Sequence, residues 1–217
     1  MKKAISLVLC LSLLAACAFS AAAEPDYYEP SVSAACAVVI EPTSGRVLFA
    51  KNADKRASMA STTKIMTALL LCENCDLQST ATVTAEMVAV EGTSMGLQAG
   101  DTVHYRDLLY GMLLASGNDA ANAAAILIAG SLKDFARLMN ARAKQLGMSS
   151  TNFVTPSGLD DENHYTTAAD MAKLAAAAMC NSAFAEAAGS TSAQLEYGSP
   201  PYKRTLTNHN KLLRLYD

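Results

Sequence analysis

The sequence has no cluster of lysine and arginine, and its 17 basic residues are outnumbered by 20 acidic residues. The formal net charge is −3, and removing the two lysines at positions 2 and 3 with an N-terminal signal would make it more negative. A protein that holds the phosphate backbone of nucleic acid needs a continuous positive surface. We therefore expect no DNA or RNA partner.

Histidine is also scarce, with three residues in the chain, and none lies close in sequence to Cys72 and Cys75. The Cys-x-x-Cys spacing of this pair occurs in redox motifs and zinc sites, but a structural zinc site needs four ligands. We interpret the pair as two small residues that close a helix, or as a local disulfide in an exported protein. The sequence therefore predicts no metal and no cofactor.

Long apolar runs are absent except at the N-terminus. There, Met1-Lys2-Lys3 precedes an apolar stretch over Ala4–Leu14 and small residues up to Ala23. This is the pattern of a secretory signal that is cleaved after an A-x-A site. No other span of about 20 uncharged apolar residues could cross a membrane. We expect an exported protein whose signal peptide covers residues 1–23.

The signal segment has a second interpretation. Leu14-Ala15-Ala16-Cys17 resembles a lipoprotein cleavage box, which would leave a lipidated Cys17 and associate the protein with a membrane. We favour cleavage after Ala23, with residues 24–33 as a linker. Residues 34–217 are then enough for one folded domain with a core.

Apolar periodicity predicts a mixed α/β domain in which a block of helices packs on one side of an antiparallel sheet. A turn at Glu41–Gly45 would join the first two strands. Ser131 would cap one helix, and Gly147 would end it. The predicted strands cover 34–40, 46–51, 82–84 and 204–208. Four predicted helices cover 105–115, 119–129, 132–146 and 181–188. Two further helices are predicted by their starts alone, at Ser61 and at Thr166 or Thr167.

Ser61-Thr62-Thr63-Lys64 opens an apolar segment, residues 65–71, that predicts a buried helix. A serine hydroxyl needs a nearby base before it can attack a carbonyl. Positions i and i+3 of a helix share a face, about 5–6 Å apart, so Lys64 can take the proton of Ser61. Burial at the helix start would lower the lysine pKa, as a base requires. The structural alternative is a serine N-cap followed by a solvated lysine.

Ser116-Gly117-Asn118 forms a polar corner between two apolar helical segments. Such a corner would present a hydroxyl that relays a proton and an amide that hydrogen-bonds a peptide. The structural alternative is a helix that ends at a C-cap glycine, followed by an asparagine cap.

With both motifs in order, the chain resembles the penicillin-recognising serine acyltransferases, which combine S-x-x-K with a second polar loop. The S-G-N form of that loop is similar to the low-molecular-weight penicillin-binding proteins, the serine-type D-alanyl-D-alanine carboxypeptidases. The resemblance runs from about Ala34 to the last residue and rests on four segments: Ala57–Thr67, Leu114–Ala120, Thr155–Leu159 and His164–Met171.

The resemblance implies a β-lactamase/transpeptidase-like fold and a peptidoglycan pentapeptide substrate, with β-lactams as inhibitors. Ser61 would attack the carbonyl of the penultimate D-alanine, and Lys64 would act as the base. Ser116 would pass the proton to the leaving D-alanine, and Asn118 would bind the substrate. Water would then hydrolyse the acyl-enzyme.

One family element is absent from the sequence. The K-T-G strand has no counterpart, because Arg204 and Thr205 add bulk after Lys203 where the family has a small glycine that lets substrate approach. We expect a fragment that lacks the last core strands and the C-terminal helix. Losing one of two oxyanion donors typically costs about 10²–10³ in rate, so the 217-residue chain should be nearly inactive.

Two other functions stay open. A β-lactamase would use the same serine and lysine, but it has S-D-N and a glutamate loop that activates the deacylating water. A catalytically inactive, wall-binding homologue is the other alternative. Among the remaining polar residues, we expect His164 to hold its loop together with Asp170, Asn208 and Asn210 to line the cleft, and Arg46 to be a solvated charge.

Overall fold

A computed structural model describes residues 30–215. The signal segment predicted at residues 1–23, including Cys17, lies outside the described residues. From Ala34 onward the described chain forms one compact unit.

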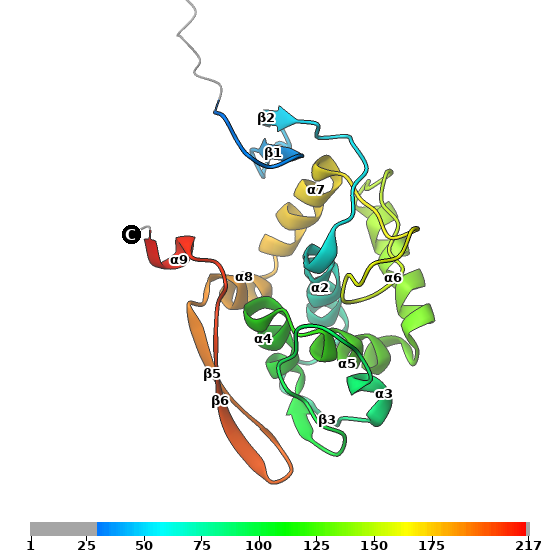
Figure 1. Ribbon diagram of the computed structural model, residues 1–217, viewed down its shortest axis with the longest axis vertical. Coiled ribbons are helices and arrows are strands. Elements are labelled where there is room, and N and C mark those ends of the chain that lie inside the picture. Colours follow the sequence, from blue (N-terminus) through cyan, green and yellow to red (C-terminus); the bar gives the residue numbers. More distant parts are fainter. Residues whose placement is uncertain (1–29, 216–217) are drawn as a thin grey trace, which may run out of the picture. The chain divides into compact units, whose positions relative to one another are not determined.

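The helix α2 (Lys64–Asn74) is the central element of this unit, and five other helices pack against it (Figure 1). Its side chains between Met66 and Leu71 are all buried, because apolar residues occupy every face of the helix. The helices around it are α4 (Tyr105–Ala115), α5 (Asn118–Ala129), α6 (Leu132–Gln145), α7 (Ala168–Met179) and α8 (Ser182–Gly189).

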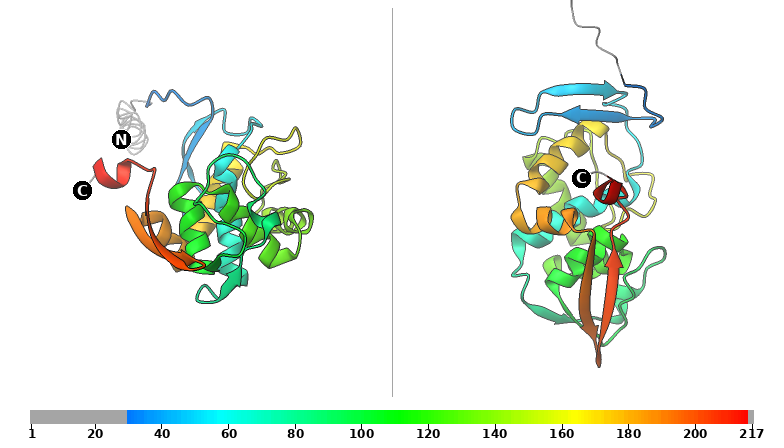
Figure 2. Two further views of the ribbon diagram at one scale, coloured as in Figure 1. Left: turned by 60° about the horizontal axis from the view of Figure 1, so that its bottom comes forward. Right: turned by 90° about the vertical axis from the view of Figure 1, so that its left-hand side faces the viewer.

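The described strands form three antiparallel pairs: β1 (Ala37–Ile40) with β2 (Val47–Lys51), β3 (Thr80–Thr82) with β4 (Thr102–His104), and β5 (Ser192–Gly198) with β6 (Pro201–Thr207). The first pair packs on α7, and the β5–β6 hairpin runs along α4 (Figure 2). The expected fold class, antiparallel strands with a helical block, is confirmed. The strands do not join into one sheet within residues 30–215.

Three predicted helix starts, those of α6, α7 and α8, agree with the structure because each has a side-chain cap. Ser131 accepts a hydrogen bond from the Asp134 N–H, and Thr167 and Asn181 cap α7 and α8 in the same way. The predicted strand bounds are less accurate, since pairing begins at Ala37 rather than at residue 34. Sequence analysis missed the short elements α3 (Ala85–Val88) and α9 (Leu212–Leu215), together with strands β4 and β5.

Candidate active site

Ser61 and Lys64 meet at the start of α2, as their spacing predicts. Ser61 lies in a 3₁₀ turn, η1 (Ala60–Thr63), and the α-helix begins at Lys64. The Lys64 Nζ is 3.3 Å from the Ser61 Oγ. Ala60 has a left-handed φ of 44°, an uncommon conformation for a residue with a side chain. Backbone strain of this kind gathers at functional sites, and here it directly precedes an exposed serine.

Lys64 is buried, and its surroundings favour the neutral amine. The residue is 2% exposed, and its Nζ donates a hydrogen bond of 2.7 Å to the backbone oxygen of Ser157. Burial lowers the pKa of Lys64 from 10.5 to about 8, although the negative charge of Asp119 works in the opposite direction. The alternative of a solvated lysine is therefore wrong, and a substantial share of the amine can accept a proton near neutral pH.

The loop that holds Lys64 is fixed tightly to the turn that carries Ser61, Ala60–Thr63. Thr67 in α2 donates a 2.7 Å hydrogen bond to the Pro156 oxygen, one residue before the oxygen that Lys64 contacts. Gly158 has a φ of +86°, and a Cβ at this position would overlap the carbonyl oxygen of Ala60. A glycine is required here because the two backbones approach so closely.

The Ser116 corner differs from the structural alternative that its sequence suggested. The residue with a left-handed φ of 55° is Ser116, whereas Gly117 has a φ of −63° and caps the start of α5. The structural alternative of a C-cap glycine is therefore wrong, because Ser116 takes the left-handed position. Within residues 30–215, the Ser116 Oγ makes no hydrogen bond to Ser61 or Lys64, so the structure does not join all three side chains.

Asn118 is buried and holds the neighbouring loop. Its Nδ2 donates to the Glu91 oxygen at 2.7 Å, and its backbone N–H donates to the Thr93 oxygen at 2.7 Å. Thr93 in turn donates through its hydroxyl to the Ser116 oxygen at 2.5 Å. The S-G-N corner and the loop from residue 91 to 97 therefore form one hydrogen-bonded unit.

Sequence analysis missed Asp119, the residue that organises this loop. Its carboxylate is 2% exposed and accepts hydrogen bonds from the Ser94 hydroxyl and from the N–H groups of Met95, Gly96 and Leu97. The sequence did carry a signal for this role: Asp119 lies in the first turn of a helix, where a negative charge is favourable, and it faces a glycine-bearing loop. The same carboxylate is close enough to Lys64 to influence its pKa, so Asp119 links the two motifs.

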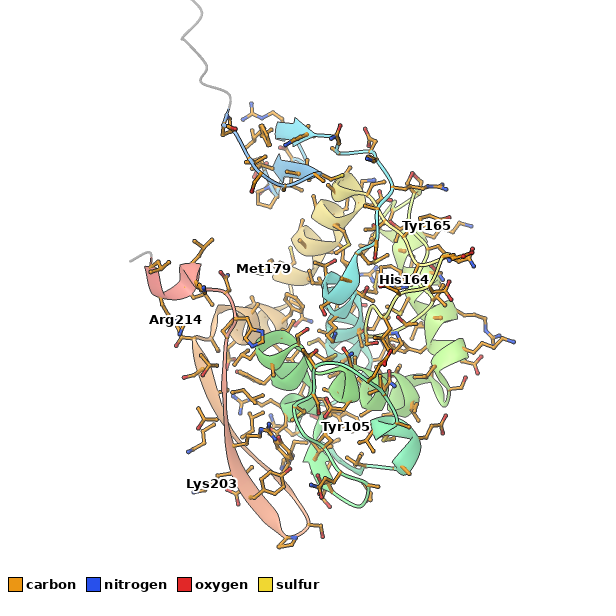
Figure 3. The ribbon with its side chains drawn as sticks, in the orientation of Figure 1. Tyr105, His164, Tyr165, Met179, Lys203 and Arg214 are labelled. Atoms are coloured by element: carbon orange, nitrogen blue, oxygen red, sulfur yellow. The ribbon has the colours of Figure 1, made fainter. Side chains whose placement is uncertain are left out.

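His164 contacts the turn that carries Ser61 and does not contact Asp170. Its Nε2 lies 2.8 Å from the Thr63 Oγ1. Figure 3 labels His164 in the loop beside the start of α2. Asp170 instead accepts hydrogen bonds from the backbone of Ser150 and from the Thr151 hydroxyl. His164 and Asp170 therefore hold different segments and make no hydrogen bond to each other: the histidine bonds Thr63 and the backbone of 154–155, and the aspartate bonds the 150–151 turn.

The remaining expectations concern residues away from Ser61. Asn208 donates to the backbone oxygens of Ala188 and Ser190, so it holds the end of α8 rather than lining a cleft. Cys72 and Cys75 are free thiols, not a disulfide. Burial raises the pKa of both, which makes them poor nucleophiles and poor metal ligands.

A cavity of about 630 Å³ lies next to the loop that anchors Lys64. Neither Ser61 nor Lys64 lines it, although Thr155, Pro156 and Ser157 form part of its wall. Ser61 is instead an exposed residue outside this cavity.

Comparison with known proteins decides the family. Residues 21–217 match the model of peptidase S11, described as D-alanyl-D-alanine carboxypeptidase. The chain belongs to this family. Two curated relatives of this S11 chain are D-alanyl-D-alanine carboxypeptidase DacF of Bacillus subtilis, 34% identical over 224 residues, and DacC of Escherichia coli, 40% identical over 175 residues.

These relatives are longer than this chain. The alignment covers 100% of this chain but 57% of DacF, and 76% of this chain but 43% of DacC. The chain thus spans about half the length of the curated relatives it matches.

Solved structures agree with this assignment. A mutant of the Streptomyces K15 DD-transpeptidase superposes with a TM-score of 0.82 at 31% identity, covering 87% of this chain and 78% of that one. A D-alanyl-D-alanine carboxypeptidase from Mycobacterium tuberculosis has a TM-score of 0.80 at 34% identity, covering 86% of this chain and 70% of that one. The fold and the family therefore point to the same class of enzyme.

Proposed function

We propose that the protein is a serine-type D-alanyl-D-alanine carboxypeptidase that trims peptidoglycan stem peptides and is inhibited by β-lactams. The observation that carries the proposal is the 3.3 Å contact between the hydroxyl of an exposed serine and a buried lysine amine. An alcohol becomes a nucleophile when an adjacent base removes its proton. Membership of the S11 family supplies the substrate class.

In the proposed reaction, the neutral Lys64 amine takes the proton as the Ser61 Oγ attacks the carbonyl of the penultimate D-alanine. The tetrahedral intermediate collapses, and the peptide C–N bond breaks. The leaving nitrogen of the terminal D-alanine receives a proton from Lys64 by way of Ser116. Water then attacks the ester on Ser61 and releases the shortened peptide, which restores the free hydroxyl.

The roles proposed for the S-G-N corner have separate support. Ser116 holds a strained left-handed backbone, which is the kind of conformation that surrounding structure maintains for a purpose. Asn118 would contact the peptide backbone of the substrate. Its Nδ2 is engaged with the Glu91 oxygen, so its carboxamide oxygen is the atom that we assign to the substrate.

The same proposal places the protein outside the cytoplasm, at the cell wall where peptidoglycan lies. The basic and apolar start of the chain supports export through a signal peptide at residues 1–23, with a lipidated Cys17 as the membrane-associated alternative. Among residues 30–215, no helix is long and apolar enough to span a bilayer.

The test incubates the 217-residue chain with a fluorescent penicillin and detects the covalent adduct by denaturing gels and intact-protein mass spectrometry. We expect a slow, long-lived adduct on Ser61 that S61A abolishes. Ser58→Ala is the matched control, because Ser58 is also exposed and lies three residues upstream. Labelling that survives in S61A would refute the proposed nucleophile. Rapid turnover of the adduct would indicate a β-lactamase, and the absence of any adduct would contradict the proposed acylation of this chain.

A further inference from the structure

His164 is a buried histidine that the proposed reaction does not use. It is 3% exposed, and both ring nitrogens have partners on different segments. We propose that His164 is a positioning residue that, as the neutral Nε2–H tautomer, locks the turn carrying Ser61 to the loop anchoring Lys64.

The hydrogen bonds of the ring fix its tautomer. The Nδ1 lies 2.9 Å from the backbone nitrogen of Val154, and a longer contact of 3.4 Å joins it to the nitrogen of Thr155. A backbone N–H can only donate, so Nδ1 must be the unprotonated acceptor. The single proton of the neutral ring is therefore on Nε2, which donates to the Thr63 Oγ1 at 2.8 Å.

The chain of hydrogen bonds continues into the turn that carries Ser61. Because Thr63 Oγ1 accepts from the histidine, its own proton is free to donate to the Ala60 oxygen, 2.8 Å away. Ala60 is the residue with the strained left-handed φ that directly precedes Ser61. The ring therefore supports the backbone conformation that presents the serine.

The other side of the ring supports the lysine. Val154 and Thr155 lead directly into Pro156 and Ser157, whose backbone oxygens accept hydrogen bonds from Thr67 and Lys64. One imidazole thus spans the two segments that set the Ser61–Lys64 distance. A shift of either segment would change that distance, and catalysis falls steeply when reacting groups are misplaced by about 1 Å.

Protonation would break this arrangement, because an imidazolium has two donors and no acceptor for the Val154 N–H. Burial lowers the pKa of His164, while the negative charges of Asp160 and Asp161 in the same loop raise it. Two cations belong to residues next to the partners and neighbours of His164: Lys64 follows Thr63 in the chain, and Arg56 stacks on the ring of Tyr165. The edge of the Phe153 ring completes the enclosure, 6.0 Å between centroids.

The first test is independent of activity. Long-range ¹H–¹⁵N NMR spectra of the chain distinguish the two neutral tautomers and the imidazolium, and with three histidines the spectrum is simple. The His164 signal, assigned by its loss in H164Q, should show the Nε2–H pattern and stay neutral as the pH falls below 6.5. An Nδ1–H tautomer, or an imidazolium at pH 7, would overturn the proposal.

The second test rests on the proposed function and measures acylation of Ser61 by the fluorescent penicillin. H164N keeps an acceptor near the Nδ1 position, and H164Q keeps a donor near the Nε2 position. Each should slow acylation about tenfold, the effect of one lost hydrogen bond, and H164F should slow it more. Equal rates in wild type and H164F would contradict the positioning role.

The pH dependence of the acylation rate distinguishes a positioning role of His164 from a simple loss of folding in the variants. In the wild type, acylation should fall with slope one below the Lys64 pKa of about 8, then with slope two once His164 also takes a proton. H164Q has no ring to protonate, so its slope should stay at one; a slope of two in H164Q would refute the proposal. If wild type does not acylate at all, the proposed function fails, while the NMR result still decides the state of His164.

Discussion

The pKa of Lys64 gives the sharpest prediction about this site, because the base must be neutral before it can accept the proton of Ser61. An ordinary lysine with a pKa of 10.5 would be neutral in about 0.03% of molecules at pH 7, whereas a pKa of about 8 makes that share about 10%. The share of molecules with a neutral Lys64 amine is therefore about 300-fold larger. The same difference means that charging the buried amine costs about 3 kcal/mol more than charging it in water.

We expect the acylation rate to rise tenfold per pH unit from pH 6.5 and to level off near pH 8. The assay follows formation of the penicilloyl adduct on Ser61 between pH 6.5 and 10 in buffers of constant ionic strength. Lys64→Arg is the control, since a guanidinium stays charged throughout this range and should not support acylation. A rate that is flat below pH 8 would refute the assignment of Lys64 as the base, and a rate that still rises tenfold per unit up to pH 10 would refute the lowered pKa of Lys64.

Two further predictions concern the structure around the site, both measured by urea unfolding. Gly158→Ala should destabilise the fold by about 3 kcal/mol or more, because it adds a clash with the Ala60 oxygen to the cost of a left-handed alanine. Gly130→Ala, also at positive φ but with open space around the added carbon, should cost only about 1–2 kcal/mol; equal losses would show that close approach is unimportant. Asp119→Ala should cost about 3 kcal/mol or more, since it leaves several buried N–H groups without an acceptor. Asp119→Asn, which keeps one acceptor, should lose less, and a loss as large as that of Asp119→Ala would argue against this account.

Local chemistry made several parts of the structure predictable from sequence. The caps Ser131, Thr167 and Asn181 each act on the backbone N–H three residues away, so the information lies in a short segment. The Ser61–Lys64 contact is predictable for the same reason, because positions i and i+3 are neighbours in any helical turn. The β5 strand forms a hairpin with the adjacent β6, but it also packs on α4 and β4, which are far away in sequence and which local reasoning cannot supply.

The corner at residues 116–118 shows where local reasoning fails. A glycine in a Ser-Gly pair is the usual left-handed residue, yet here Ser116 takes that conformation while Gly117 starts the next helix. Contacts from the 91–97 loop, through Thr93 and Asp119, hold the serine there. Such strain persists only when surrounding structure maintains it, and that structure is not encoded in the corner itself.

The sequence by itself determined which side chains can do the chemistry and that the serine and lysine share one helical turn, because both follow from residue type and short-range geometry. The tertiary structure decided whether the lysine can act as a base. Desolvation and the charge of Asp119 set its pKa, and both depend on folding: Asp119 is 55 residues away along the chain, and Ser157, which accepts a hydrogen bond from the amine, is 93 residues away. It also decided the role of His164, since a ring nitrogen becomes an acceptor or a donor only when folding brings a particular backbone N–H against it.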